Sequence, residues 1–134
     1  MQKVDEQTKT IKVNRGDVLN LHLTADMDDG TKYTFQNGDK VIFAVYEKGK
    51  LQEPAVIFKQ INITEASQSV SINLTSQETK IGDIKNKEVE YWYEVELNGQ
   101  YTIIGYDDKE DDKGEKAKKF ILYPEGSRIE WMET

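Results

Sequence analysis

Apolar and polar residues alternate with a period of two along most of the chain. In VLNLHLT (18–24), Leu19, Leu21 and Leu23 alternate with polar residues, the pattern of a β-strand that buries one face and exposes the other. KVIFAVYE (40–47) is apolar on both faces, which is typical of a central strand. Strand character also occurs at 8–13, 32–35, 55–63, 69–75, 89–97, 101–106 and 118–123.

Short segments rich in Gly, Asn and Asp separate these strands, as expected for turns. NGQ (98–100) is short enough for a tight hairpin with Gly99 at positive φ. Only residues 76–88 lack strand alternation, and the spacing of Ile81 and Ile84 there predicts one helical turn or an ordered corner. Eight or nine short strands at this spacing predict an all-β fold, an antiparallel β-sandwich.

Aromatic residues are concentrated in one stretch, 90–107, which holds four of the seven tyrosines and one of the two tryptophans. Tyr91 and Tyr93 share a strand face with Val95 and Leu97, which predicts that they belong to the core. A tyrosine near the start of a late strand can also hold a corner through its hydroxyl, so we expect Tyr91 or Tyr93 to contact the 76–88 segment. Trp92 lies on the opposite face with two glutamates, and is either exposed or covered by a second sheet.

Length and charge narrow the range of functions. A chain of 134 residues predicts a single domain, 1–134. The formal net charge of −7, with only two arginines, argues against nucleic acid and anionic membranes as partners. The sequence has no cysteine, no apolar run of about 20 residues and no secretory signal. We therefore expect synthesis and folding in the cytoplasm, with no secretion by a signal peptide.

Candidate catalytic chemistry is sparse. The single histidine, His22, falls among the outward positions of a predicted strand, no second histidine is present to form a metal pair, and no serine lies in a G-x-S-x-G turn. We predict no catalytic residues, no cofactor and no metal site. A pair of carboxylates for glycoside hydrolysis stays open, because their separation is invisible in the sequence.

Two acidic loops are candidate calcium sites. ADMDDGT (25–31) fails the EF-hand pattern, because Ala25 and Met27 fall on the first and third ligand positions. We expect a turn between Leu23 and Tyr33 instead. The acidic residues Asp107, Asp108, Asp111 and Asp112 are mixed with lysines, so a solvated hairpin loop is the favoured interpretation and cation binding stays open.

The ordered set of motifs resembles a known family. The set runs from R-G-D (15–17) and D-D-G-T (28–31) through Y-x-F-x-x-G-D-K-V-I-F-x-V-Y (33–46). It continues with S-V-S-I-N-L-T (69–75), Y-W-Y-E-V-E-L-N (91–98), T-I-I-G-Y (102–106) and K-K-F-I-L-Y-P-E-G (118–126). In this order the motifs resemble the immunoglobulin-like domain of phage tail and baseplate proteins, in particular the N-terminal domain of the baseplate upper protein.

The resemblance implies an immunoglobulin-like β-sandwich with a non-enzymatic, structural role in the virion tail. Its implied partners are other tail or baseplate proteins, and it leaves homo-oligomers open. Baseplate upper proteins continue into further parts after this domain, so the place of this chain in a tail stays open. For protein–protein contacts we single out Trp92 and the C-terminal Ile129, Trp131 and Met132, because aromatic residues often anchor interfaces.

Two alternatives accompany the structural role. Ile129, Trp131 and Met132 are interspersed with Glu130 and Glu133, so the C-terminal segment is either a docking segment or a last strand, and strand addition to a partner's sheet would satisfy both. The second alternative is a carbohydrate-binding β-sandwich that stacks sugar rings on Trp92 and Tyr106. An enzyme is the least favoured function.

Overall fold

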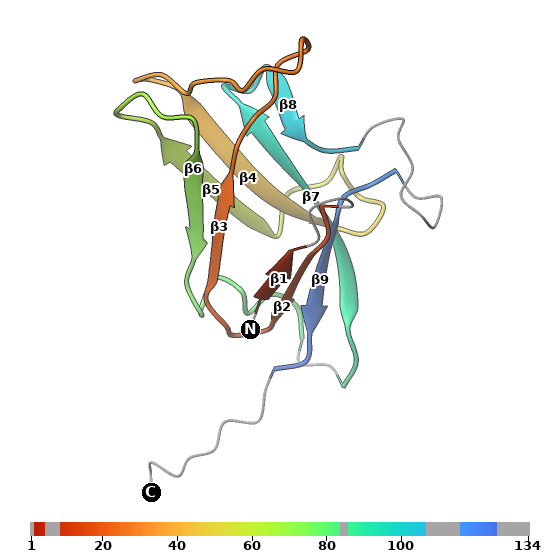
Figure 1. Ribbon diagram of the computed structural model, residues 1–134. Helices are drawn as coiled ribbons and strands as arrows, with labels where there is room; N and C mark the ends of the chain where they lie inside the picture. Colours follow the sequence, from red (N-terminus) through yellow and green to blue (C-terminus); the bar gives the residue numbers. More distant parts are fainter. Residues whose placement is uncertain (1, 5–8, 84–85, 107–115, 126–134) are drawn as a thin grey trace, which may run out of the picture.

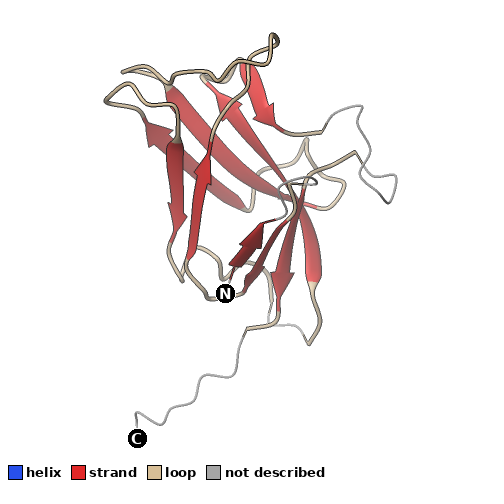
Figure 2. Ribbon diagram, in the orientation of Figure 1, coloured by secondary structure: helices blue, strands red, loops and turns tan. Residues whose placement is uncertain are grey.

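The computed structural model describes residues 2–4, 9–83, 86–106 and 116–125, and this part of the chain is all-β, with no helix. It therefore contains no helix long enough to cross a membrane. The strands are shown in Figures 1 and 2. They are β1 (Gln2–Val4), β2 (Ile11–Asn14), β3 (Leu19–Leu23), β4 (Lys40–Glu47), β5 (Ile57–Asn62), β6 (Val70–Leu74), β7 (Val89–Leu97), β8 (Tyr101–Ile104) and β9 (Lys119–Tyr123).

The strands form two sheets. The larger sheet has the order β1-β2-β9-β7-β4-β5, with β8 also paired to β7, and the smaller sheet consists of β3 and β6. In Figure 1 the smaller sheet crosses in front of the larger one. The pairing of β2 with β9 is parallel, from Ile11 opposite Phe120 to Asn14 opposite Tyr123. The larger sheet is therefore mixed, and the prediction of a purely antiparallel arrangement is wrong, because alternation does not encode strand direction.

The long strand β7 organises the larger sheet. One of its edges pairs with β4 along Tyr91–Leu97. Its other edge is shared: the first half pairs with β9 and the last residues pair with β8, with a register shift between Val95 and Glu96. Such irregularities bend a strand and increase its twist, and the larger sheet is visibly curled in Figure 2.

One hydrophobic core lies between the two sheets. Phe43, Phe120 and Phe35 are its largest fully buried side chains. Tyr91, Tyr93, Val95 and Leu97 are buried in it, which confirms the predicted core face of this strand. Packing therefore explains Tyr91 and Tyr93, while the other three aromatic residues of the stretch, Trp92, Tyr101 and Tyr106, are left outside the core cluster.

The predicted hairpin after β7 is confirmed. Asn98 and Gly99 both have positive φ, 56° and 66°, and the amide of Gln100 donates to the carbonyl of Leu97 at 3.0 Å. Two positive-φ residues between paired strands are the signature of a type I′ turn, which Asn-Gly favours. The Asn98 side chain also accepts from the Lys40 amide at 2.8 Å, which ties the turn to β4.

The 76–88 segment forms an ordered corner in its described residues. The Thr75 amide donates to the Glu78 carboxylate at 2.9 Å, and the Glu78 amide donates to the Thr75 hydroxyl at 3.2 Å. This reciprocal pattern is that of a capping box, and it starts a single turn in which the Thr79 amide donates to the Thr75 carbonyl.

The strands of the structure differ from the predicted ones in two places. Residues 32–35 form isolated bridges, Asp26 with Lys32 and Phe35 with Ser67, and are not a strand. Phe35 supplies the apolar signal there because it is buried in the core. The second difference is β1, which the sequence does not predict because its three residues are too few to show alternation.

Candidate functional site

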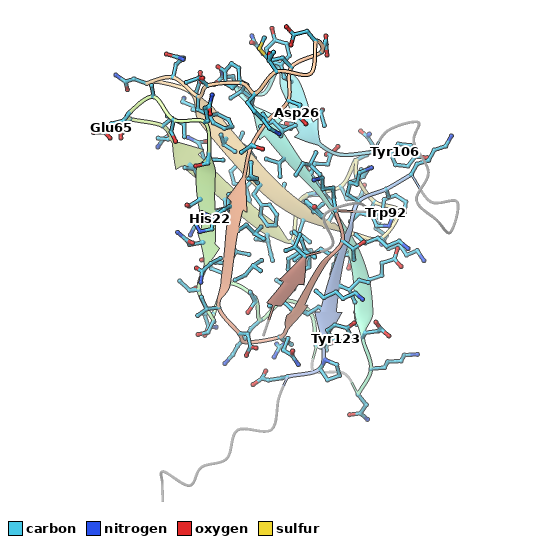
Figure 3. The ribbon with its side chains drawn as sticks, viewed as in Figure 1. His22, Asp26, Glu65, Trp92, Tyr106 and Tyr123 are labelled. Atoms are coloured by element: carbon cyan, nitrogen blue, oxygen red, sulfur yellow. The ribbon has the colours of Figure 1, made fainter. Side chains whose placement is uncertain are left out.

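The outer face of β7 carries an aromatic cluster, which we call the outer aromatic patch: Tyr46, Trp92 and Tyr106. Tyr46 lies directly opposite Trp92 in the β4–β7 register. The rings of Trp92 and Tyr106 are 6.2 Å apart at 45°, within the range of favourable aromatic contacts. Figure 3 shows the two side chains next to each other on the outside of the molecule. Tyr106 is 54% exposed, whereas Tyr46 and Trp92 are partly buried, so Trp92 is neither fully exposed nor covered by the second sheet.

Carboxylates border the outer aromatic patch. Trp92 Nε1 donates to Glu90 Oε2 at 3.0 Å, and Lys48 Nζ lies 3.8 Å from the same oxygen. Burial and the neighbouring Glu96 raise the pKa of Glu94 above its usual value. The patch therefore offers flat aromatic surface beside hydrogen-bond acceptors, a combination that suits a protein side chain or a sugar ring.

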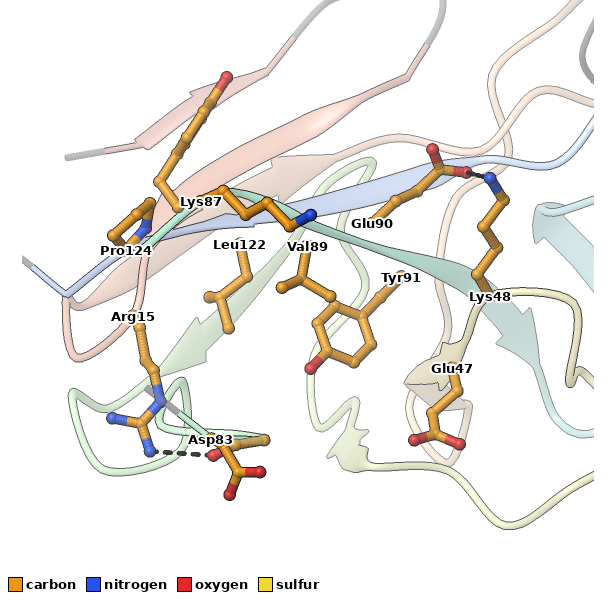
Figure 4. Close-up of a pocket in the computed structure, with 12 residues that line it drawn as sticks. Arg15, Glu47, Lys48, Asp83, Lys87, Val89, Glu90, Tyr91, Leu122 and Pro124 are labelled. Atoms are coloured by element: carbon orange, nitrogen blue, oxygen red, sulfur yellow. Dashed lines mark hydrogen bonds and ion pairs between the residues drawn. The ribbon is translucent and has the colours of Figure 1, made fainter. Parts of the chain in front are cut away.

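A cavity of about 300 Å³ lies at the start of β7, between this strand, the end of β9 and the 76–88 corner, and Glu90 and Lys48 border both the cavity and the outer aromatic patch. Val89, Leu122 and Tyr91 form its apolar floor, and the Tyr91 hydroxyl points into it (Figure 4). Burial, followed by the nearby Glu47 carboxylate, raises the pKa of Tyr91. Lys87 and Asp83 stand at its edge with opposite charges, so the cavity has no strong preference for one sign of ligand charge.

Arg15 closes this cavity and has a structural role. Its guanidinium lies 2.7 Å from the Glu125 carboxylate. It also donates to the carbonyls of Ile81 at 3.2 Å and Gly82 at 3.1 Å. A planar guanidinium suits such simultaneous contacts. Arg15 therefore joins the turn before β3, the 76–88 corner and the residues after β9.

The two core tyrosines anchor different segments. A Cβ on Gly82 would lie 2.7 Å from the Tyr91 hydroxyl, so Tyr91 does contact the 76–88 corner, as expected. Tyr93 instead donates its hydroxyl to the Lys9 carbonyl at 2.5 Å, and burial raises its pKa. The expected role in the corner therefore belongs to Tyr91, while Tyr93 anchors the residue just before Thr10 and β2.

The structure places His22 and the 25–31 segment as expected from the sequence. His22 is exposed on β3, with Nδ1 2.9 Å from the Ser71 hydroxyl, as expected for a solvated strand residue. The 25–31 segment is a turn: Gly30 N donates to Met27 O, and Asp29 accepts from Thr31.

The C-terminal Ile129, Trp131 and Met132 lie outside the described residues, as do the four aspartates of the 107–112 loop. Among the residues that the structure describes, no group of His, Asp or Glu is arranged to hold a metal.

Sequence reasoning missed two parts of the site. Tyr46 joins the outer aromatic patch only through the β4–β7 register, which alternation alone does not fix. Arg15 stands out in the sequence only as part of R-G-D (15–17), because its contacts with residues 81, 82 and 125 are distant in sequence.

Comparisons with known proteins assign no family to the chain. No protein-family model matches the chain, and no curated protein matches it either.

Proposed function

We propose that this chain is a non-enzymatic structural module of a phage or prophage tail or baseplate and that it acts through protein–protein contacts. The observation that carries the proposal is the placement of the resembling motifs. G-D-K-V-I-F-x-V-Y covers β4, S-V-S-I-N-L covers β6, Y-W-Y-E-V-E-L lies on β7, and K-F-I-L-Y is β9. The motifs are therefore successive strands around one core, which supports a resemblance of the whole fold.

We further propose that the fold is an immunoglobulin-like β-sandwich. The pair β3–β6 opposite the run β9-β7-β4-β5 matches strands B and E opposite G, F, C and C′ of that fold. Tyr91 near the start of β7, with its hydroxyl against Gly82, is comparable to the tyrosine corner at the start of strand F. β8 is then an addition between F and G.

Contacts with other tail proteins would use the outer aromatic patch. Aromatic side chains are enriched at the centres of protein interfaces. Phe58, which is 61% exposed, lies opposite Ala44 on the same outer face, so the apolar surface extends across three strands. A structural module of this kind needs a stable core and an apolar surface for its partners, and the buried core and the outer aromatic patch support the proposal.

The test is the composition of purified particles. Phage would be induced from the source strain and purified, and peptides of this chain sought by mass spectrometry. We expect several copies per particle. The protein's presence in the lysate but absence from particles would overturn the proposal.

A carbohydrate-binding module is the second candidate, and the contact between Trp92 and Tyr106 favours it. Two adjacent rings with carboxylates beside them can stack on a sugar face and accept hydrogen bonds from its hydroxyls. Titration with a panel of polysaccharides, followed by tryptophan fluorescence, tests this function. Quenching in wild type that is lost in Trp92→Phe and Tyr106→Ala, but kept in Tyr101→Ala, would support it.

A further inference from the structure

A groove of about 600 Å³ opens between the two sheets, on the side where β3 faces the edge of the larger sheet. Its apolar walls come from both sides: Leu21 and Leu23 of β3, Tyr93 and Val95 of β7, and Ile103 and Ile104 of β8. Leu23, Ile103 and Ile104 are only partly buried. Within the part of the chain that the structure describes, the groove is therefore an incompletely covered part of the core, and Val4, Lys9 and Ile11 also line it.

The groove follows the edge of a strand. Five consecutive residues, 20–24, line it, although alternate residues of a strand point to opposite faces. A cavity that touches all five must run along the strand's edge. Among the described strands, β3 pairs only with β6, so the groove lies along the edge of β3 opposite to β6. A cavity bordered by a strand edge and apolar walls has the shape that accepts an added β-strand.

The residues after Glu125 have the matching pattern. The sequence there is GSRIEWMET (126–134), in which Ile129 and Trp131 alternate with Glu130 and Met132. As an added strand it would direct Ile129 and Trp131 to one face, toward the apolar walls. Five residues cover the length of the groove along β3, and nine residues are present, which span roughly 30 Å when extended.

The charges on the rim of the groove also favour the residues after Glu125 as its occupant. The groove's rim carries Asp26 with two lysines near it: Lys32 Nζ is 2.6 Å from the Asp26 carboxylate, and both Lys32 and Lys9 lower the pKa of Asp26. This part of the rim therefore has more positive than negative charge. The segment carries Glu130 and Glu133 against the one cation Arg128, so its net negative charge complements this part of the rim.

We propose that this groove binds residues 127–133 of a second copy of the chain as an added strand. The contact is heterologous, because the groove and the segment are different surfaces, so it joins copies head to tail into a ring or a filament. The inference stands on the groove and the segment, and it does not depend on the role in a phage tail.

A second copy fits the geometry better than the same chain does. Glu125 is held by Arg15, just before the turn that leads into β3. From there, the chain's own segment would have to enter the groove at the start of β3 and pair parallel to it. A segment from a second copy enters from the other end and pairs antiparallel, which is the more stable pairing per residue.

Disulfide trapping tests the proposal cleanly because the full chain has no cysteine. One preparation carries His22→Cys, on the exposed face of β3 at the groove. The other carries Arg128→Cys, Glu130→Cys or Met132→Cys, three alternate positions that cover the registers in which the strand can bind. Equal amounts are mixed and oxidised mildly. Phe58→Cys, which is more exposed but lies on the far face of the larger sheet, replaces His22→Cys as the control.

We expect a disulfide-linked heterodimer with His22→Cys for at least one of the three positions, at least tenfold above the Phe58→Cys control. Adding Trp131→Ala should reduce the yield about tenfold, whereas Gln68→Ala, far from the segment in sequence, should not. Equal yields with the control, or no heterodimer at any position, would overturn the proposal. A chain that carries both cysteines and closes on itself as a monomer would also overturn it, because the segment would then belong to the same chain. Circular dichroism of each variant confirms that it is folded.

Discussion

At the residue scale, the clearest structural role belongs to Thr79, a fully buried polar residue. Its hydroxyl donates to the Asp17 carbonyl at 2.8 Å and accepts from the Gly16 amide at 3.0 Å. A buried polar group keeps its place only when it is hydrogen-bonded. Thr79 therefore fastens the 76–88 corner to the turn before β3.

Thr79→Val tests this role, since the side chain keeps its shape and loses its hydroxyl. We expect a loss of about 1–3 kcal/mol in the free energy of unfolding, because the Gly16 amide and the Asp17 carbonyl each lose a hydrogen bond at a buried side chain. Urea denaturation measures it through the midpoint at constant m-value. Thr64→Val, at an exposed position, is the matched control and should change the free energy by less than about 0.5 kcal/mol.

Gly82 tests the contact with Tyr91. It has φ +66° and a Cβ there would lie 2.7 Å from the Tyr91 hydroxyl, while Gly49 has φ +76° and open space around it. Both Gly→Ala changes add backbone strain, so each should destabilise the protein by about 1 kcal/mol or more. Gly82→Ala should cost more, because it also displaces the tyrosine.

Tyr91→Phe provides the second arm of this prediction. Removing the hydroxyl removes the steric conflict. The double variant Gly82→Ala/Tyr91→Phe should therefore lose less free energy of unfolding than the sum of the losses in the two single variants. A double-mutant cycle from urea denaturation gives this coupling free energy. Additive costs would mean that the tyrosine does not support the corner.

At the scale of elements, strands were predictable and their partners were not. Alternation located β3, β4, β6, β7 and β9 closely, because each buries one or both faces. It misassigned 32–35, where Phe35 is buried without a ladder, and it could not show that β2 runs parallel to β9. The contact between Trp92 and Tyr106 was likewise open, because it depends on the path of the chain after β8.

Glu94 on the outer face of β7 should make the stability of the protein depend on pH. Burial and Glu96 raise the pKa of Glu94 in the folded protein above the usual 4.5. The folded state therefore favours the protonated carboxyl. The stability that the protonated Glu94 carboxyl contributes is fully present below pH 4.5 and is lost as the pH rises through the raised pKa.

Glu94→Gln is uncharged at every pH. The free energy of unfolding of Glu94→Gln minus that of wild type should therefore be larger at pH 7 than at pH 3.5. Urea denaturation at both pH values measures this difference. Glu53→Gln, at an exposed position between β4 and β5, is the control for general charge effects. An equal difference from wild type at the two pH values would contradict the prediction.

At the scale of the whole molecule, stability depends on contacts between distant parts of the chain. Phe120 of β9 is fully buried and its ring lies 6.3 Å from that of Phe43 on β4. The same strand pairs with β2, over a hundred residues earlier. The core is therefore complete only when both ends of the described chain have been incorporated.

Phe120→Ala should cost about 3–5 kcal/mol in the free energy of unfolding, the usual loss for a buried phenylalanine. Phe58→Ala removes the same atoms from a side chain that is 61% exposed and should cost less than about 1 kcal/mol. Thermal and urea unfolding of both variants measure the difference. Similar losses would show that β9 is not part of the cooperative core.

The parallel pairing of β2 with β9 also determines how the molecule would carry a mechanical load. Because the two strands run in the same direction, a pull between the start of β2 and the end of β9 acts along the strands in opposite senses. The hydrogen bonds between them are then loaded together in shear, and none can open before the others. A protein tethered through these two strands would resist extension until the whole ladder ruptures in one event.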